Sequence, residues 1–299
     1  MCNTGLISDI QRFSLGDGDG IRTTVFMQGC NLLCPWCHNP ETINNNGSLL
    51  LYKNLCVSCG GCKNACPENI IDIKDNCEIA DRNKCILCGK CENACLNNAI
   101  KLSGKRMTVD EVFGVIMQDA EFYAKSSGGV TLSGGEPLLQ IDFCVELAKK
   151  CFENNISVVV DTAGDVPLDI FERIIPFTDC FYFDLKSIIE DYEKINANGG
   201  RIYDNLARLS AVCKTVARIP VIPGFNDSDE IMESFAGFLS GINIHEAHFL
   251  PFHRLGSGKY RALGLKYTFE DYIPESDDYM EHFVKIFTDK KIEIVLRRD

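Results

Sequence analysis

The stretch GCNLLCPWCHNPET, residues 29–42, decides how the rest of this 299-residue chain is interpreted. It spaces three cysteines as C-x3-C-x2-C, and they are Cys30, Cys34 and Cys37. Structural metal sites usually close their coordination with protein ligands, whereas catalytic sites keep one position open. Three thiolates can bind three irons of a [4Fe–4S] cube and leave the fourth iron without a protein ligand. The stretch therefore predicts a catalytic iron–sulfur site. The alternative is a fourth cysteine from elsewhere in the chain.

Residues 51–104, which we call the insert, contain an internal repeat. CVSCGGCKNACPENIIDI begins at residue 56 and CILCGKCENACLNNAIKL begins at residue 85. Both have the spacing C-x2-C-x2-C-x3-C of bacterial two-cluster ferredoxins, in which the fourth cysteine of each run binds the other cluster. The predicted ligands of the first insert cluster are Cys56, Cys59, Cys62 and Cys95. The predicted ligands of the second insert cluster are Cys85, Cys88, Cys91 and Cys66.

The insert is expected to fold only with its clusters, because it is too small to bury a large core. Pro67 follows the first run as the pattern expects, but Leu96 stands where a second proline would be, which changes no ligand. A pair of zinc sites is the competing interpretation, and two complete runs of four cysteines disfavour it. All eight thiolates are then used, so none is left for the cube of the opening stretch. The predicted role of the insert is electron relay.

The other cysteines are predicted to be structural. Eleven of the 17 cysteines belong to the three groups above. Clustered thiols in a chain of this length indicate metal ligands in a reducing compartment rather than disulfides. Isolated buried cysteine behaves as a small apolar residue. This interpretation applies to Cys2, Cys77, Cys144, Cys151, Cys180 and Cys213.

Strand-like and helix-like runs alternate after the insert. The strand-like runs are short, nearly continuous in apolar residues and rich in Val, Ile and Phe, which is typical of a parallel sheet covered by helices. They span residues 129–133, 156–162, 180–186, 215–222 and 246–252, and residues 21–28 before the insert have the same character. Amphipathic helices are predicted over residues 108–125, 140–154 and 228–240.

About six βα units of this kind predict an α/β fold, a partial (β/α)6 TIM-like barrel. Its predicted extent is residues 1–50 and 105–299, with residues 51–104 as an inserted α+β ferredoxin-like domain. Polar and glycine residues gather where the predicted strands end, and barrel active sites are built at the carboxyl ends of the strands.

Charge and hydropathy exclude several classes of partner. The formal net charge is -12 and the pI is near 4.9, which argues against nucleic acid and anionic membranes. No apolar run approaches the length of about 20 residues that spans a bilayer. The amino terminus does not read as a signal peptide. We therefore expect a cytoplasmic protein.

Several motifs in order resemble the radical S-adenosylmethionine (SAM) enzymes that activate glycyl radical enzymes, the family of pyruvate formate-lyase activating enzyme. Besides the cysteine stretch, they are SLGDGDGIRTTVFMQGC (14–30), SGGEP (133–137), DTAG (161–164), FDLK (183–186), RIPVIPGFND (218–227) and LPFHRLGSGKY (250–260). The insert resembles that of the longer subgroup of this family. Asp19 is a departure, because relatives usually have proline there, and it affects how that loop would meet a partner.

The resemblance implies roles for individual residues around the cluster of Cys30, Cys34 and Cys37. The amino and carboxylate groups of SAM would bind the open iron. The residues implied near the methionine end of SAM are Gly134, Gly135, Glu136 and Lys186. Those implied around a monovalent cation beside SAM are Asp161, Thr162 and Asp184, since hard oxygen ligands suit such an ion. Those implied near the adenine or lining the site are Trp36, His38, Arg218 and His253.

Three of these residues have ordinary structural alternatives. Trp36 could belong to the hydrophobic core. Asp161 could cap a helix that follows its strand. His253 alone would more often be structural than a cofactor contact.

The activity implied by the resemblance is that of an anaerobic oxidoreductase that reductively cleaves SAM to methionine and a 5′-deoxyadenosyl radical. The radical abstracts a hydrogen atom from a glycine Cα of a partner glycyl radical enzyme. Because the cofactors carry the chemistry, no side chain is required as a general acid or base. Implied partners also include flavodoxin or ferredoxin as reductant, with the chain as a monomer.

Two other functions compete with this one. One is an electron-transfer protein whose three clusters only relay electrons, but SGGEP, DLK and PFH around an incompletely ligated cube argue against it. The other is a radical SAM enzyme that acts on a different peptide or small molecule. Many such enzymes carry extra cysteines after the barrel, whereas the last cysteine of this chain is Cys213.

Overall fold

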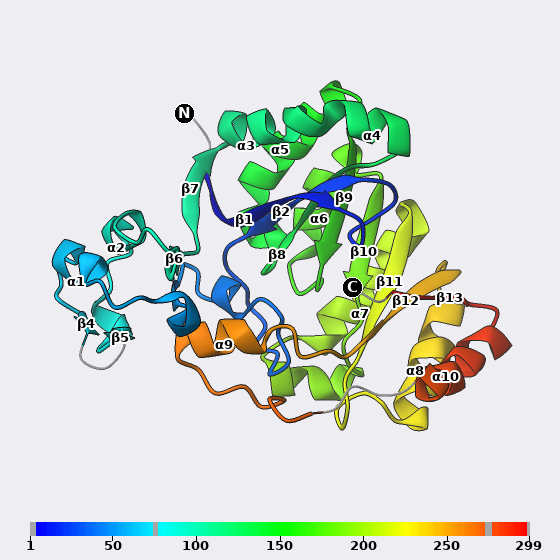
Figure 1. Cartoon of the computed structure of the whole chain (residues 1–299). Helices are drawn as coiled ribbons and strands as arrows, with labels where there is room; N and C mark the ends of the chain where they lie inside the picture. Colours follow the sequence, from blue (N-terminus) through cyan, green and yellow to red (C-terminus); the bar gives the residue numbers. More distant parts are fainter. Residues whose placement is uncertain (1–3, 74–76, 273–276, 298–299) are drawn as a thin grey trace.

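One nine-stranded sheet organises the fold (Figure 1). The computed structural model describes residues 4–73, 77–272 and 277–297, so Cys2 lies outside the described residues. Across the sheet the strand order is β7-β1-β2-β8-β9-β10-β11-β12-β13. In chain order its strands are β1 (Thr4–Ser14), β2 (Arg22–Met27), β7 (Lys105–Thr108), β8 (Gly129–Gly134), β9 (Ser157–Thr162), β10 (Cys180–Asp184), β11 (Thr215–Val221), β12 (Glu246–Pro251) and β13 (Glu293–Leu296).

The sheet is mostly parallel, as predicted. Each neighbouring pair from β2 through β13 runs parallel, whereas β1 pairs antiparallel with both β2 and β7. The six predicted strands are confirmed as β2 and β8 to β12, which is consistent with a partial TIM-like barrel. The sequence did not predict the edge strands β7 and β13 or the neighbouring strand β1. Edge strands are half exposed, so the long apolar runs that marked the central strands are missing from them.

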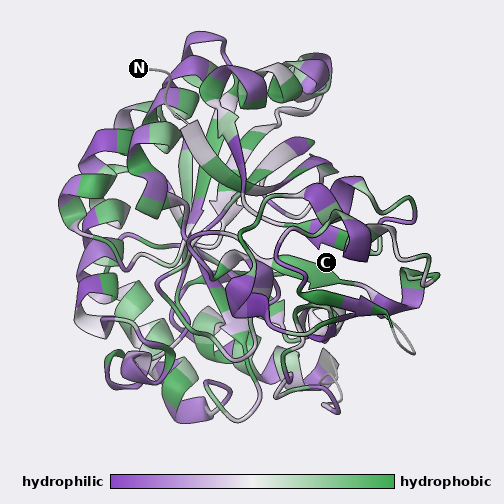
Figure 2. Ribbon diagram, turned by 90° about the vertical axis from the view of Figure 1, so that its left-hand side faces the viewer, coloured by the Kyte–Doolittle hydropathy of each residue, from purple (hydrophilic) through white to green (hydrophobic). Residues whose placement is uncertain are grey.

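Helices follow most of the parallel strands and cover the sheet. They are α3 (Val109–Ile116), α4 (Ala120–Ser126), α5 (Ile141–Glu153), α6 (Leu168–Ile174), α7 (Gly199–Val212), α8 (Asp229–Ser240), α9 (Ser257–Leu263) and α10 (Asp277–Asp289). Figure 2 shows helices whose ribbons alternate between hydrophobic and hydrophilic residues, as helices with one buried face do. In α5 the buried face includes Cys144 and Cys151, which confirms their structural interpretation.

The helix predicted over residues 108–125 is divided in two. A 3-10 helix, Met117–Asp119, separates α3 from α4. Asp119 is fully buried and accepts hydrogen bonds from Arg12 of β1 at 2.7 and 2.5 Å. A polar group at this depth needs such a partner. The break therefore coincides with an ion pair between the exposed Arg12 and the buried Asp119, which the helical periodicity did not predict.

Residues 49–102, as far as the structure describes them, form a small unit of two-stranded sheets and short helices. Strand β3 (Leu49–Leu51) pairs antiparallel with β6 (Ile100–Leu102), and β4 (Ile71–Ile73) pairs antiparallel with β5 (Cys77–Ile79). Its helices are α1 (Gly61–Ala65) and α2 (Lys90–Asn93). Figure 1 shows β4 and β5 at the end of this unit that is far from the large sheet, with α9 beneath β6.

Contacts with α9 hold the insert against the rest of the chain. Leu50 of β3 packs against Ala262 and Leu263 of α9. Arg82 donates to the carbonyl oxygen of Ala262 at 2.9 Å and also to that of Leu49.

In the described part of the chain, no helix is long and apolar enough to cross a bilayer.

Candidate active site and metal centres

The predicted active-site residues come together at the carboxyl ends of the parallel strands. The cysteine stretch follows β2, the SGGEP motif spans the end of β8, and Lys186 follows β10. Asp161 and Thr162 end β9, and His253 follows β12. The DGDG loop precedes β2 and so lies at the opposite, amino end, where the side chain of Asp19 is 74% exposed. In this fold, residues distant in sequence meet because each follows a neighbouring strand.

Backbone hydrogen bonds hold the cysteine stretch in place. The amide of Gly29 donates to the carbonyl of Thr42 at 2.7 Å, which closes residues 29–42 into a loop. Burial raises the pKa of the Cys30 and Cys34 thiols to about 12 and raises that of Cys37 as well. Buried thiols ionise when a metal supplies compensating positive charge. Three shielded thiols on one loop therefore have the donor chemistry for an iron–sulfur cluster.

The glycines of SGGEP are required by neighbouring backbone. A Cβ atom on Gly135 would lie 2.1 Å from the carbonyl oxygen of Gly29, and one on Gly134 would lie 2.2 Å from the nitrogen of Met27. The amide of Glu136 donates to the same Gly29 oxygen at 2.8 Å. The two glycines thus let the end of β8 lie directly against the start of the cysteine stretch. The sequence analysis had assigned them only to contact with SAM.

Glu136 fixes this junction from a fully buried position. Its carboxylate lies 2.8 and 2.9 Å from the hydroxyl oxygen of Thr162 and accepts from the amides of Ala163 at 2.9 Å and Leu138 at 3.1 Å. Burial raises the pKa of Glu136 to about 7, although these hydrogen bonds favour the ionised form. The residue connects β8 to β9 and stabilises the turn, as expected. Thr162 is engaged with it.

Lys186 is a buried cation beside the cysteines. Its ammonium lies 2.6 Å from a carboxylate oxygen of Asp184, and its amide donates to the hydroxyl of Tyr192 at 2.8 Å. Burial alone would lower the pKa of Lys186, but the charges of Asp184 and Cys34 outweigh burial and raise it. The side chain is therefore a fixed positive charge that can bind a carboxylate.

Asp161 lies in the strand, so the helix-cap alternative is wrong. Its Oδ2 atom accepts from Ser133 at 2.9 Å and from Arg218 at 3.2 Å. Its Oδ1 atom is buried and has no hydrogen-bond partner among the described residues. A buried carboxylate oxygen without a donor suits a bound cation. This oxygen therefore fits the cation that the family resemblance implies.

The two predicted histidines stack on each other. The rings of His38 and His253 lie 4.0 Å apart, and Nε2 of His38 donates to the carbonyl oxygen of His253 at 3.1 Å. Burial lowers the pKa of His38 to about 4, so the ring is neutral near pH 7. Trp36 is 4% exposed and packs 4.4 Å from the ring of Phe225. Trp36 thus belongs to the core, as its structural alternative expected.

The sequence analysis missed an ion pair that anchors the loop after the third cysteine. Lys259 of α9 donates to Glu41 at 2.5 Å and to Asn39 at 2.6 Å. Glu41 is in the opening stretch and Lys259 is in LGSGKY, so both motifs had been noted. Nothing in the sequence indicated that residues 218 positions apart would pair. The pair stabilises the loop that carries Cys37.

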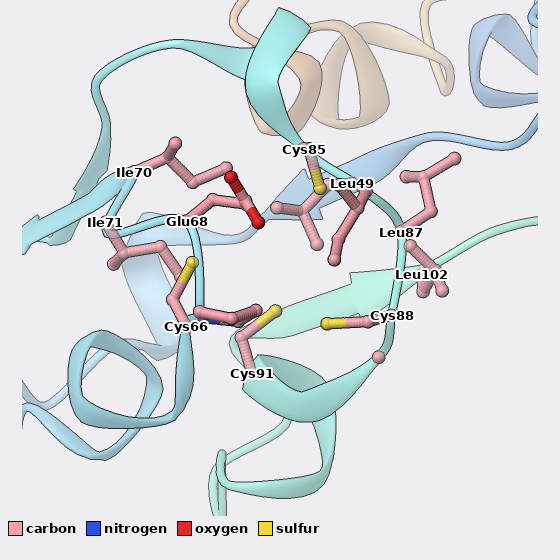
Figure 3. A pocket seen from close by; sticks show the side chains of 13 residues that line it. Leu49, Cys66, Glu68, Ile70, Ile71, Cys85, Leu87, Cys88, Cys91 and Leu102 are labelled. Atoms are coloured by element: carbon pink, nitrogen blue, oxygen red, sulfur yellow. The ribbon is translucent and has the colours of Figure 1, made fainter.

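Four cysteines of the insert line one cavity (Figure 3). They are Cys66, Cys85, Cys88 and Cys91, the predicted ligands of the second insert cluster. Figure 3 shows their sulfur atoms pointing into this space, whose empty volume is about 340 Å³ including the part open to solvent. Leu49, Ile70, Ile71 and Leu102 add apolar walls. One cysteine thus comes from the first run and three come from the second.

The thiols of the first insert set also gather. The charges of Cys56 and Cys95 both act on Cys62 and raise its pKa, after burial as the main cause. A fifth thiol, Cys77, lies beside this set, with its Sγ atom 3.9 Å from that of Cys62. Among the described residues, no group of three or more His, Cys, Asp or Glu side chains is arranged for a single metal ion. In a cube, by contrast, each thiolate binds its own iron.

Comparisons with known proteins agree with these motifs. Residues 24–236 match the family model of the Radical SAM superfamily. The chain is 40% identical to the 4-hydroxyphenylacetate decarboxylase activating enzyme of Clostridioides difficile (strain 630), covering 96% of this chain and 94% of that protein. It is 37% identical to the (2S)-3-sulfopropanediol dehydratase activating enzyme of Klebsiella oxytoca, covering 93% and 91%.

A solved structure supports the fold alone. SuiB of Streptococcus suis, bound to the precursor peptide SuiA, aligns with a TM-score of 0.51 at 12% identity. The alignment covers 66% of this chain and 43% of that one.

Proposed function

Since the chain belongs to the radical SAM superfamily, and within it to the activating enzymes of glycyl radical enzymes, we propose that Cys30, Cys34 and Cys37 hold its SAM-binding [4Fe–4S] cluster. When bound, this cluster and SAM supply reductive cleavage of the sulfonium and the 5′-deoxyadenosyl radical that takes a hydrogen atom from a glycine Cα. What the chain itself contributes is binding, orientation and exclusion of water. The single observation that carries the assignment is the meeting of three half-buried thiols with the cation of Lys186.

Different residues around the cysteines would bind SAM or shape its site. Lys186, a fixed positive charge, would bind the methionine carboxylate of SAM. Gly134 and Gly135 bring the backbone of β8 to the cysteine loop, and Glu136 keeps that turn rigid. The neutral ring of His38 stacks on the ring of His253, and together they form a wall just after β12.

A monovalent cation completes the polar side of this site in our proposal. The Oδ1 atom of Asp161, which has no hydrogen-bond partner among the described residues, would provide one ligand. Asp184, which also pairs with Lys186, would provide another. Thr162 would contribute only through its backbone, because its hydroxyl is engaged with Glu136. Arg218 positions Asp161 from the neighbouring strand.

We assign the insert as a ferredoxin-like domain with two [4Fe–4S] clusters, so that the whole chain holds three. The cavity lined by Cys66, Cys85, Cys88 and Cys91 supports this assignment, because it combines cysteines of both runs. The clusters would pass electrons from flavodoxin or ferredoxin. The related activating enzymes are named for different partners, a decarboxylase and a dehydratase. We therefore propose a glycyl radical enzyme as the partner of a monomeric activating enzyme without naming its substrate.

Iron analysis and SAM cleavage test these assignments together. Anaerobically reconstituted protein should contain about twelve irons per chain, and four or fewer would contradict the insert assignment. With dithionite and SAM it should produce 5′-deoxyadenosine, which chromatography detects. Cys34→Ala should abolish this product while the insert clusters remain visible by electron paramagnetic resonance. Cys213→Ala is the matched control and should leave product formation unchanged. A Cys34→Ala protein that still forms the product would overturn the site.

A further inference from the structure

Cys77 is a buried thiol that the proposed clusters do not use as a ligand. It lies at the start of β5, is 0% exposed and contacts Cys62, which is 7% exposed. Their Sγ atoms are 3.9 Å apart, within hydrogen-bond distance for sulfur. Cys62 belongs to the proposed ligand set of the first insert cluster. Cys77 therefore contacts a ligand atom of that cluster.

Ligation fixes the direction of this hydrogen bond. In two free thiols either sulfur can be the donor. A cysteine that binds iron is a thiolate and has no proton to donate. Cys77 is not among the proposed ligands, so no iron replaces the proton of its thiol. Cys77 is then the donor and Cys62 the acceptor.

The second insert cluster has an apolar residue in the equivalent place. Position 77 pairs with Ile73 across β4 and β5, and Leu49 pairs with Leu102 across β3 and β6. When the two runs are aligned on their first cysteines, Cys56 and Cys85, Ile73 and Leu102 occupy the same position of the repeat. Leu49 is therefore the counterpart of Cys77, and it lines the cavity of the second cluster (Figure 3).

We propose that Cys77 donates an S–H hydrogen bond to Cys62 and makes the first insert cluster easier to reduce than the second. This inference rests on the proposed two-cluster assignment of the insert. Hydrogen bonds to ligand sulfurs are among the factors that set cluster reduction potentials. A donor stabilises the extra negative charge of the reduced cluster more than that of the oxidised cluster. Each reduction adds one electron from the chemical reductant and moves no proton.

A redox titration of the insert clusters tests this role. The full chain carrying Cys30→Ala, Cys34→Ala and Cys37→Ala should retain only the insert clusters, with about eight irons. Titration with dithionite, followed by electron paramagnetic resonance, should show two separate reduction steps. Adding Cys77→Ala should shift the earlier step to lower potential and leave the later step in place. Cys77→Ser keeps a donor and should preserve the separation.

Leu49→Cys is the matched gain-of-donor variant. It places a thiol at the equivalent position and should move the later step to higher potential. Two loaded clusters with unchanged potentials in Cys77→Ala would overturn the role of Cys77 but not the cluster assignment. Loss of about four irons in both Cys77 variants would also overturn the proposed donor role, because Cys77 would then be an iron ligand. A triple-alanine protein without two clusters would overturn both proposals.

Discussion

At the scale of single residues, the site contains charged side chains that are mostly shielded from water and paired with opposite charges. Lys186 and Asp184 lie within one short segment, and both side chains are mostly shielded from water, at 14% and 20% exposure. Removing one partner of such a pair leaves the other buried without compensation, which is costly. Lys186 therefore compensates the shielded charge of Asp184 and also places its ammonium group toward the cysteine loop.

Lys186→Met should weaken SAM binding by roughly 10- to 100-fold, the loss expected for a charged hydrogen bond of about 1.5–3 kcal/mol. Anaerobic calorimetry on the reconstituted protein measures the affinity. Lys194→Met is the matched control, because Lys194 also pairs with an aspartate but is 62% exposed. Equal affinity of wild type and Lys186→Met would remove Lys186 from the site.

The buried Glu136 makes stability depend on pH. Its folded pKa of about 7 lies above the value of about 4.3 in an unfolded chain, so the folded state holds the proton more tightly. Its contribution is fully present below about pH 4.3 and is lost as pH rises through 7. Between pH 5 and 7 wild type should lose about 2 kcal/mol relative to Glu136→Gln, which does not titrate.

Anaerobic unfolding of both reconstituted proteins at several pH values measures this difference. The glutamine side chain turns an amide group toward backbone donors, so the variant should be less stable overall. The test is therefore the slope with pH and not the absolute stability. Parallel slopes for the two proteins would show that Glu136 is already ionised at pH 5.

At the scale of elements, the sequence predicted what lies inside the sheet better than what lies at its edges. The central strands are apolar on both faces, and that composition predicted β2 and β8 to β12. Strand β1, next to the edge strand β7, mixes buried and exposed positions and contains charged residues, so its composition resembled a loop. Motifs at strand ends predicted which residues gather in the site. They did not predict the Lys259–Glu41 pair, because tertiary packing alone brings those elements together.

The junction between β8 and the cysteine loop should tolerate no side chain at Gly135. Gly135→Ala would place a methyl group 2.1 Å from the Gly29 oxygen and displace the cysteine loop. We expect loss of 5′-deoxyadenosine formation, while electron paramagnetic resonance still detects the insert clusters. Gly114→Ala is the control, because no atom lies within 4 Å of its added methyl group in α3. That change should stabilise the helix by about 0.5–1 kcal/mol. An active Gly135→Ala enzyme would contradict the rigid junction.

At the scale of the whole molecule, the insert and the large sheet are joined by a narrow connection. The chain enters the insert through β3 and leaves through β6, and Leu51 pairs with Ile100. Paired residues of antiparallel strands lie about 5 Å apart, a gap that a two-residue turn can close. Leu50 and α9 would keep their contact if only the residues beyond this pair were removed.

Replacing residues 52–99 with Asn-Gly should leave a protein that binds about four irons and still cleaves SAM when dithionite supplies the electron. With a protein reductant, such as flavodoxin, its rate should fall if the insert relays electrons. Product formation with each reductant separates the two effects. A shortened protein that binds no iron would show that the insert is needed to fold the barrel.

The adjacency of β3 and β6 also has an evolutionary consequence. A segment whose two ends are neighbours can be acquired or discarded in a single genetic event, without changing the register of any strand in the large sheet. Selection on the insert can then act separately from selection on the large sheet and the site at its strand ends.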